Sequence, residues 1–187
     1  MNLFFNVLIL LLFSHTGSAT LARIDSLSTM SQKSDIIVHA KLTDQKIIQD
    51  KDGRPITLTT LKVIDGLKGK TTGDTVTIYQ VGGQINHKSL HIAGAHTYKK
   101  DEELIFFGEK LKDMYVSYGL GLGKFVIEKG KIIEDVHDIM AVSNDASDPK
   151  EAKPRMYPSL DYFKEEIRKS IEPHHTYFEP VFKRKGH

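Results

Sequence analysis

The chain has 187 residues and a formal net charge of +2, with 26 lysines and arginines against 24 aspartates and glutamates. This near balance creates no field that would collect nucleic acid, so we expect no nucleic-acid partner. Cysteine is absent, which excludes disulfides, thiolate metal sites and a cysteine nucleophile. The length fits one domain with a sizeable core.

The first nineteen residues have the layout of a secretory signal. Residues 3–13 are apolar apart from Asn6, and the small residues at 16–19 predict cleavage after Ala19. The run is shorter than the roughly 20 apolar residues that span a bilayer. We therefore expect an exported protein, periplasmic or secreted, with no membrane span after cleavage. A retained anchor or a buried helix is the alternative, because no Lys or Arg precedes the run.

After residue 19, apolar residues recur every third position from Leu21 to Met30, which predicts a short amphipathic helix that Thr20 could cap. Two strands follow at residues 36–42 and 56–64. In the second strand the apolar set changes phase across Thr59 and Thr60. With a side-chain period of two, such a change predicts a bulge or a bend, as in a barrel rather than a flat sandwich.

Further strands are predicted at residues 75–81, 104–107, 114–118, 124–128 and 131–136. Residues 104–107 are apolar on both faces, as in a central strand. Residues 143–158 read as a linker or surface loop, after which Ser159 can cap an amphipathic helix in the segment 159–187. The predicted fold is mainly β: an OB-like, closed or partly open barrel over residues 20–142, with a short N-terminal helix and a C-terminal helix.

Four segments carry a resemblance to a family of exported bacterial proteins with no settled activity: residues 80–83, 91–95, 101–107 and 118–125. They correspond to a Gly-Gly after the third strand, a Gly-Ala-Pro loop, an acidic turn into a Leu/Phe strand, and a Gly-Lys-Phe strand start. His96 stands where that family usually has proline, and Asp101 where it often has glycine. The resemblance implies an exported OB-type barrel and names no activity.

Residues 34–41 and 63–69 look more distantly like the first strands of tissue inhibitors of metalloproteinases and netrin-like domains. This resemblance implies an OB-type barrel that presents its N-terminal edge to a protease, so a secreted metalloprotease is the implied partner. Those inhibitors grip the protease zinc with a disulfide-fixed N-terminal Cys. This chain has no Cys, and Thr20 would supply the free amine and carbonyl after cleavage.

The glycine-flanked segment 82–96 is the longest loop predicted inside the barrel, and loops on a rigid scaffold commonly bind ligands. The predicted binding residues are Gly82, Gly83, His87, His91, Gly94 and His96. On a strand, His87 and His91 would lie about 13 Å apart, too far to share one ion held at about 2 Å. We therefore predict no metal or other cofactor, although folding at Gly94 could bring His91 and His96 together.

No nucleophile elbow, zinc-binding helix motif or phosphate loop is present, and we predict no catalytic residue. The sequence favours a non-enzymatic exported module that recognises another protein, conceivably a secreted protease, through residues 82–96. The competing interpretation is a metal-dependent hydrolase that uses His91, His96 and an acidic neighbour. A structural envelope protein is a third.

Overall fold

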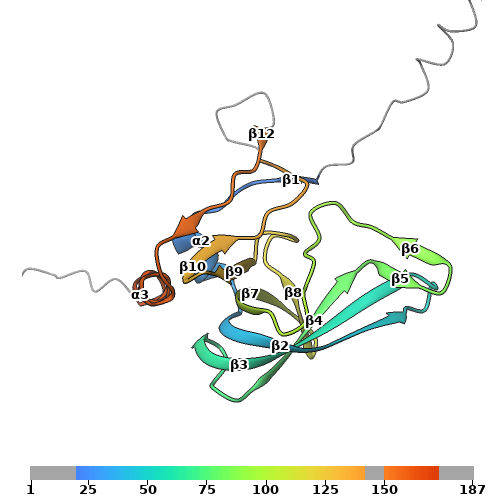
Figure 1. Cartoon of the computed structure of the whole chain (residues 1–187), viewed down its shortest axis with the longest axis horizontal. Coiled ribbons are helices and arrows are strands. Elements are labelled where there is room, and N and C mark those ends of the chain that lie inside the picture. The colour runs from blue at the N-terminus through green and yellow to red at the C-terminus, as the bar shows by residue number, and fades with distance from the viewer. Residues whose placement is uncertain (1–19, 142–149, 173–187) are drawn as a thin grey trace, which may run out of the picture.

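The computed structural model of the protein describes residues 20–141 and 150–172. The predicted signal at residues 1–19 lies outside these ranges, as do residues 142–149 of the predicted loop and the tail after residue 172. The fold is mainly β with one N-terminal and one C-terminal helix, as the sequence predicts (Figure 1). Among the described residues, no helix is long and apolar enough to cross a membrane.

Eight strands form the main sheet, in the order β13-β10-β9-β7-β2-β3-β4-β8. Strand β8 pairs in parallel with β4 and also antiparallel with β7, so the pairings β7-β2-β3-β4-β8 return to their first strand. The strand bounds are β2 (Ile36–Gln49), β3 (Pro55–Lys68), β4 (Thr75–Val81), β7 (Glu103–Leu111), β8 (Met114–Ser117), β9 (Lys124–Glu128), β10 (Lys131–Glu134) and β13 (Met156–Tyr157).

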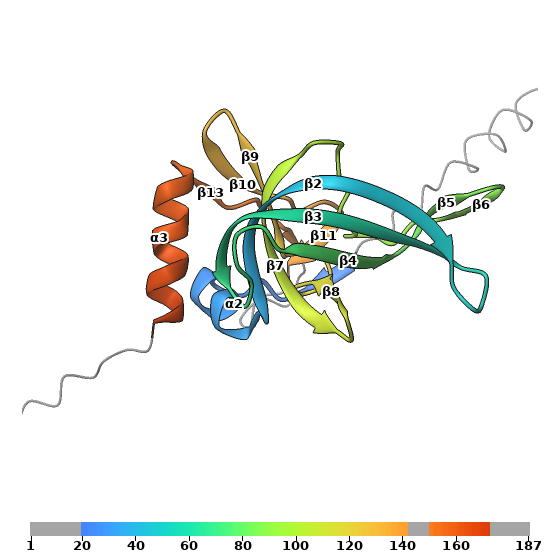
Figure 2. The ribbon, with the colours of Figure 1, turned by 90° about the horizontal axis from the view of Figure 1, so that it is seen from below.

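Two smaller sheets flank this one. Strands β5 (Gly83–Ile85) and β6 (Lys88–Leu90) form a hairpin that lies beyond the far ends of β3 and β4 (Figure 2). Strand β1 (Thr20–Ala22) pairs in parallel with β11 (Ile139–Ala141), which pairs in turn with β12 (Lys150–Glu151). The described part of the predicted 143–158 linker thus contains two short strands, β12 and β13.

The N-terminal helix lies later in the chain than the apolar spacing predicts. Helix α2 spans Leu27–Lys33 and begins after Ser26, whose Oγ accepts a hydrogen bond from the Thr29 N–H at 3.1 Å. Thr20 is not a helix cap but the first residue of β1. The pairing with β11, more than a hundred residues away in the sequence, gives residues 20–22 backbone partners that a local pattern cannot reveal.

The first five residues of β2 and residues 104–108 of β7 are buried on both faces, because each face contributes to a different apolar cluster. On β7, Leu104 and Phe106 pack with Val38 and Leu42 of β2 in one cluster. Ile105 and Phe107 point the other way, into a cluster that also contains residues of the two helices. The alternation follows from the period of two, and it confirms that residues 104–107 form a central strand.

The pairing of β2 with β3 is irregular in three places, between Ile37 and Val38, between His39 and Ala40, and between Leu42 and Asp44 of β2. The last irregularity lies opposite Leu61 and Thr60, beside the predicted position, and its extra residue is Thr43 of β2. Strand β3 keeps an unbroken register with β4 from Ile56 to Lys62. Thr59 is buried, which its hydrogen bond from the Gln45 side chain to Oγ1, at 3.0 Å, allows.

Helix α3 (Leu160–Ile171) begins after Ser159, the predicted cap, whose Oγ accepts from the Tyr162 N–H at 3.2 Å. It stands beside the sheet and α2 (Figure 2). Its buried Phe163 lies 4.8 Å from Phe125 and 4.3 Å from Tyr157, measured between ring centroids. The helix thereby closes the second apolar cluster.

Candidate functional site

The candidate site is built from two segments that meet at one end of the main sheet. The first is the crossing loop, residues 91–101, which leads from β6 to β7. The second is the glycine turn, residues 118–123, which leads from β8 to β9. Gly121 allows them to touch, because a Cβ at that position would lie 2.0 Å from the Gly94 carbonyl oxygen of the crossing loop.

A buried ammonium group anchors the crossing loop from below. Lys124, the first residue of β9, is only 1% exposed. Its Nζ lies 3.0 Å from Oε2 of Glu102 and 3.0 Å from Oδ2 of Asp135. It also donates to the Thr97 carbonyl and stands 4.7 Å from the centroid of the Tyr98 ring. A charge buried this deeply needs such partners, since an unpaired one would be very costly.

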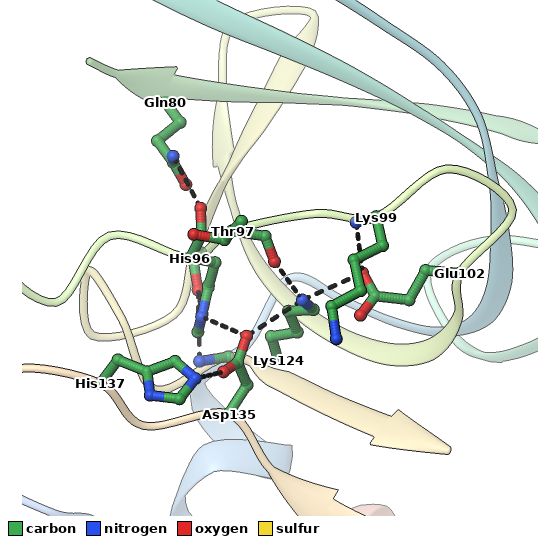
Figure 3. Close-up of polar contacts among 10 residues, drawn as sticks. Gln80, His96, Thr97, Lys99, Glu102, Lys124, Asp135 and His137 are labelled. Carbon is green, nitrogen blue, oxygen red and sulfur yellow. Dashed lines mark hydrogen bonds and ion pairs between the residues drawn. The ribbon is translucent and has the colours of Figure 1, made fainter. Parts of the chain in front are cut away.

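His96 ties the same loop to the end of β8 (Figure 3). Its Nε2 is hydrogen-bonded to Ser117 Oγ at 2.9 Å, and its Nδ1 lies 3.5 Å from Oδ2 of Asp135. The His96 carbonyl accepts from the side chain of Gln80 on β4 at 3.0 Å. We call His96, Glu102, Ser117, Lys124 and Asp135 the buried polar cluster. It joins the crossing loop to the end of β8, the start of β9 and the residue that follows β10.

The pKa values in this cluster shift in the directions that burial and charge dictate. Burial lowers the pKa of the His96 imidazole, and the Asp135 carboxylate only partly opposes that effect. Burial alone would raise the pKa of Asp135, but contact with His96 and the charge of Lys124 hold it well below its usual range. At neutral pH the cluster therefore contains a neutral imidazole beside an ionised carboxylate.

Ser117, His96 and Asp135 are the residue types of a nucleophile, a base and an orienting acid. Their geometry suits a structural cluster better. Asp135 Oδ2 is shared with Lys124, and Ser117 is buried with its Oγ also accepting a hydrogen bond from the Gly123 N–H at 3.2 Å. A nucleophile needs a hydroxyl that is free to approach a substrate, whereas Ser117 Oγ is held by hydrogen bonds with both His96 and Gly123.

Four of the six predicted binding residues meet at one hollow of about 310 Å³, the polar hollow. Gly82, Gly83, His91 and His96 line it together with amide and hydroxyl side chains of β2, β3 and β4. His96 belongs to its buried wall, and His91 is exposed at its edge. The remaining lining residues are Gln45, Ile47, Thr57, Gln80, Val81, Gln84, Ser89, Leu90, Ile92, Ala95, Thr97 and Tyr98.

The Gly82–Gly83 pair serves the chain's own packing. Both residues have positive φ, 116° and 126°. A Cβ on Gly83 would lie 2.7 Å from Thr57 Oγ1, and one on Gly82 would lie 3.0 Å from the Leu90 carbonyl oxygen. Without side chains, these two residues let the backbone pass close to Thr57 of β3 and to Leu90 of β6.

The other two predicted residues lie outside the lining of the polar hollow. His87 is exposed in the turn of the β5–β6 hairpin, and Gly94 is buried against Gly121. The histidines also face different carboxylates: His91 Nε2 lies 3.8 Å from Asp138, whereas His96 faces Asp135. Within residues 20–141 and 150–172, no group of three His, Asp or Glu side chains is arranged to hold a metal ion.

An apolar hollow of about 160 Å³ adjoins the polar one on the other side of the crossing loop. Leu120 of the glycine turn and Ile92 of the crossing loop stand at its edge, 78% and 41% exposed. The other lining residues are Ile78, Tyr79, Gln80, Val81, Ala93, Ala95, Val116 and Ser117. Large apolar side chains that remain exposed beside an apolar hollow are a feature of interaction sites.

Leu120 is displayed by a strained turn. Its φ is 65°, in the left-handed region that residues other than glycine rarely adopt. The residues on either side are joined by a hydrogen bond from the Gly121 N–H to the Gly119 carbonyl, at 2.8 Å. A hydrogen bond spanning two residues with positive φ at the centre is the rare form of γ-turn. For a leucine this conformation costs about 1–2 kcal/mol. Strain of this kind collects at functional positions.

The sequence did not predict Leu120 or the members of the buried polar cluster other than His96. The three glycines at 119, 121 and 123 were the available signal, because an apolar residue between glycines in a turn has few packing partners of its own. Lys124 and Asp135 gave no signal, since charged residues are rarely buried unless paired, and their partners lie far away in the sequence.

Comparison with known proteins supplies no family. No protein-family model matches the chain, and a search of curated proteins finds no significant relative.

Proposed function

We propose that the protein is an exported, non-enzymatic binding module on an OB-type barrel, which recognises another protein with the surface around the apolar hollow. The observation that carries this proposal is Leu120, held exposed and strained at the edge of that hollow. A strained, exposed leucine does nothing for the fold, so a role in binding accounts for it. The partner class implied by the sequence resemblance is a secreted protease, in particular a metalloprotease.

The support for an OB-type barrel is the pattern of strand pairing. Five consecutive strands of the main sheet, β2, β3, β4, β7 and β8, pair in a ring, and one apolar cluster is made of residues from these strands and Tyr98. Five strands closed in this way are the number found in OB-type barrels, which use loops and strand faces for recognition. Export and cleavage after Ala19 rest on the sequence of residues 1–19.

The size of the apolar hollow supports a protein partner. Sites that enclose small molecules measure about 300–1,000 Å³, and this hollow of about 160 Å³ is smaller. A cavity of about 150 Å³ holds a benzene ring. The hollow therefore has room for one large apolar side chain, the kind of anchor that dominates binding at protein interfaces.

The buried polar cluster supports a pre-formed surface. Ser117 below the glycine turn and Thr97 in the crossing loop are both held by buried hydrogen bonds. A surface that is already ordered loses less conformational entropy on binding. The cluster thus has a scaffold role that requires no catalysis.

Replacement of Leu120 tests the proposal without harming the fold. Leu120→Gly removes the exposed side chain and relieves the positive φ, so the free energy of unfolding should stay level or rise by up to about 1 kcal/mol. Met156→Gly on β13 is the matched control, because Met156 is 69% exposed and apolar but does not line the hollow.

Immobilised wild type, Leu120→Gly and Met156→Gly are then exposed to periplasmic extract or culture medium of the producing organism. The proposal expects one protein to be retained by the wild type and the Met156 variant and lost from the Leu120 variant. A protein retained equally by all three, or by none, contradicts it. Inhibition of a retained protease by the wild type, and not by the Leu120 variant, would support the protease assignment.

A hydrolase is the second candidate, and the His96–Ser117 hydrogen bond is the observation that favours it. Labelling by a fluorophosphonate that disappears in Ser117→Ala would support this class. For the metal-dependent form, bound zinc, copper or manganese in the purified protein would support this class, as would a thermal shift when one of these metals is added.

A further inference from the structure

Three lysines in and beside the crossing loop have no carboxylate partner in the described chain. Residues 83–100 include these three lysines and no aspartate or glutamate, and the acidic run Asp101 to Glu103 follows. Lys88, Lys99 and Lys100 are exposed, and within the described ranges none of them forms an ion pair with a carboxylate. Other lysines do form such pairs, for example Lys41 with Asp101 and Lys164 with Asp65. The excess charge is therefore local to this segment.

The hollows along this loop follow one another. The apolar hollow shares Gln80, Val81, Ile92 and Ala95 with the polar hollow. The polar hollow in turn shares Gln45 and Tyr98 with a third hollow of about 270 Å³, which Lys100 and Asp44 also line. The series thus leads from an apolar end at Leu120 to a charged end, where Lys100 is exposed and forms no ion pair among the described residues.

The middle of this series offers hydrogen-bonding groups without charged side chains of Asp, Glu, Lys or Arg. They belong to Gln45 of β2, Gln80 of β4 and Gln84 of β5, together with the hydroxyl residues Thr57 and Ser89. Side-chain amides both donate and accept hydrogen bonds, so they match a ligand that brings backbone N–H and carbonyl groups.

We infer that the partner binds through an extended peptide segment that places a phenylalanine or leucine in the apolar hollow and carboxylates beside Lys99 and Lys100. This inference rests on the proposed function and adds the chemistry of the partner. An extended backbone suits the polar middle, because its amides can pair with the side-chain amides of Gln45, Gln80 and Gln84. Carboxylates complement the unpaired lysines, which also speeds association.

Synthetic peptides labelled with fluorescein test the inference by anisotropy with the purified protein. The first peptide contains one phenylalanine followed by a short glycine spacer and four carboxylate residues. In the second, phenylalanine is replaced by alanine, and in the third the carboxylates are replaced by their amides. We expect the first to bind, and each change to weaken it about tenfold or more, since one anchor or a cluster of charges contributes at least about 1.4 kcal/mol. Raised salt should weaken the first peptide as well.

Protein variants locate the charge contribution. Lys99→Ser combined with Lys100→Ser should reproduce the loss seen with the amide peptide. Lys129→Ser combined with Lys131→Ser is the matched control, because both lysines are exposed in the β9–β10 hairpin and should leave binding unchanged.

The outcomes separate this inference from the proposed function. If the amide peptide binds as well as the acidic one, or if polyglutamate without an apolar residue binds equally, the inference is overturned. If no peptide binds although a natural partner is lost on Leu120→Gly, the inference fails and the proposed function stands. If the Leu120→Gly variant also retains the natural partner as well as the wild type does, both the inference and the proposed function fail.

Discussion

At the residue scale, the molecule shows how a polar side chain becomes buried without penalty. Each ring nitrogen of His96 has a polar neighbour, Ser117 at Nε2 and Asp135 at Nδ1. The Lys124 ammonium contacts two carboxylates and a backbone carbonyl. Each of these groups would be expensive to bury alone. The consequence of such complete pairing is that the cluster responds to pH through its one readily titrated member, His96.

We predict that His96 makes the protein less stable as the pH falls from about 7 to about 5. Because burial lowers its pKa in the folded state, the unfolded chain takes up a proton near the ordinary histidine pKa of about 6.5 and the folded protein does not. The free energy of unfolding should therefore fall with pH, by at most about 1.4 kcal/mol per pH unit for each such histidine. His39, whose pKa burial also lowers, acts in the same direction.

Urea midpoints measured across this pH range provide the check. His96→Gln can keep a hydrogen bond to Ser117 but cannot titrate, so its profile should be flatter than that of the wild type. His87→Gln, at the exposed hairpin turn, should retain the wild-type slope. Identical slopes for all three proteins would show that His96 does not set the acid response.

At the element scale, the crossing loop and the glycine turn are held as one unit. The contact between Gly94 and Gly121 brings the two backbones together, and the His96–Ser117 hydrogen bond fixes them to β8. Neither segment has a hydrogen-bonded ladder of its own in the described structure. Their order therefore depends on these few contacts.

Gly121→Ala should release the crossing loop. The new methyl group would lie 2.0 Å from the Gly94 carbonyl oxygen, so one backbone must move, at a cost of about 1–3 kcal/mol. Trypsin cleavage after Lys99 and Lys100 should become faster, since local opening exposes the loop. Gly130→Ala is the control, because a Cβ there meets nothing within 4 Å and its strain, from a φ of 77°, is confined to the β9–β10 turn. Its cleavage at Lys99 and Lys100 should match the wild type.

At the scale of the whole molecule, the fold is one mainly β body on which both helices close a second apolar cluster. Phe107 and Phe125 of the sheet meet Phe163 of α3, and Asp65 of β3 pairs with Lys164 of the same helix at 2.9 Å. With no disulfide available, the C-terminal helix is held by aromatic packing and by ion pairs at its edge.

Phe163→Ala should cost about 3–5 kcal/mol, because the side chain is fully buried among aromatic rings. Tyr162→Ala on the neighbouring, half-exposed position should have little effect. Chemical denaturation followed by circular dichroism measures both. A small loss for Phe163→Ala would mean that α3 contributes little to the stability of the sheet.

Elements with strong local signals were predictable from the sequence. The bounds of β4 and β9 and the cap at Ser159 are as expected, because alternation, glycine and capping chemistry are all local. The strand at Thr20 and the assignment of the extra residue opposite Thr60 to β2 were not, since each depends on a partner elsewhere in the chain. The site divides in the same way: the glycine-rich loop could be located, whereas the Lys124–Asp135 pair and the exposure of Leu120 required the folded structure.

The exposure of Leu120 also offers a spectroscopic opportunity. The chain contains no tryptophan, so Leu120→Trp would give the molecule a single indole, placed at the mouth of the apolar hollow. Its emission would shift to shorter wavelength when a bound chain shields it from water, and one titration curve would report occupancy of that position alone.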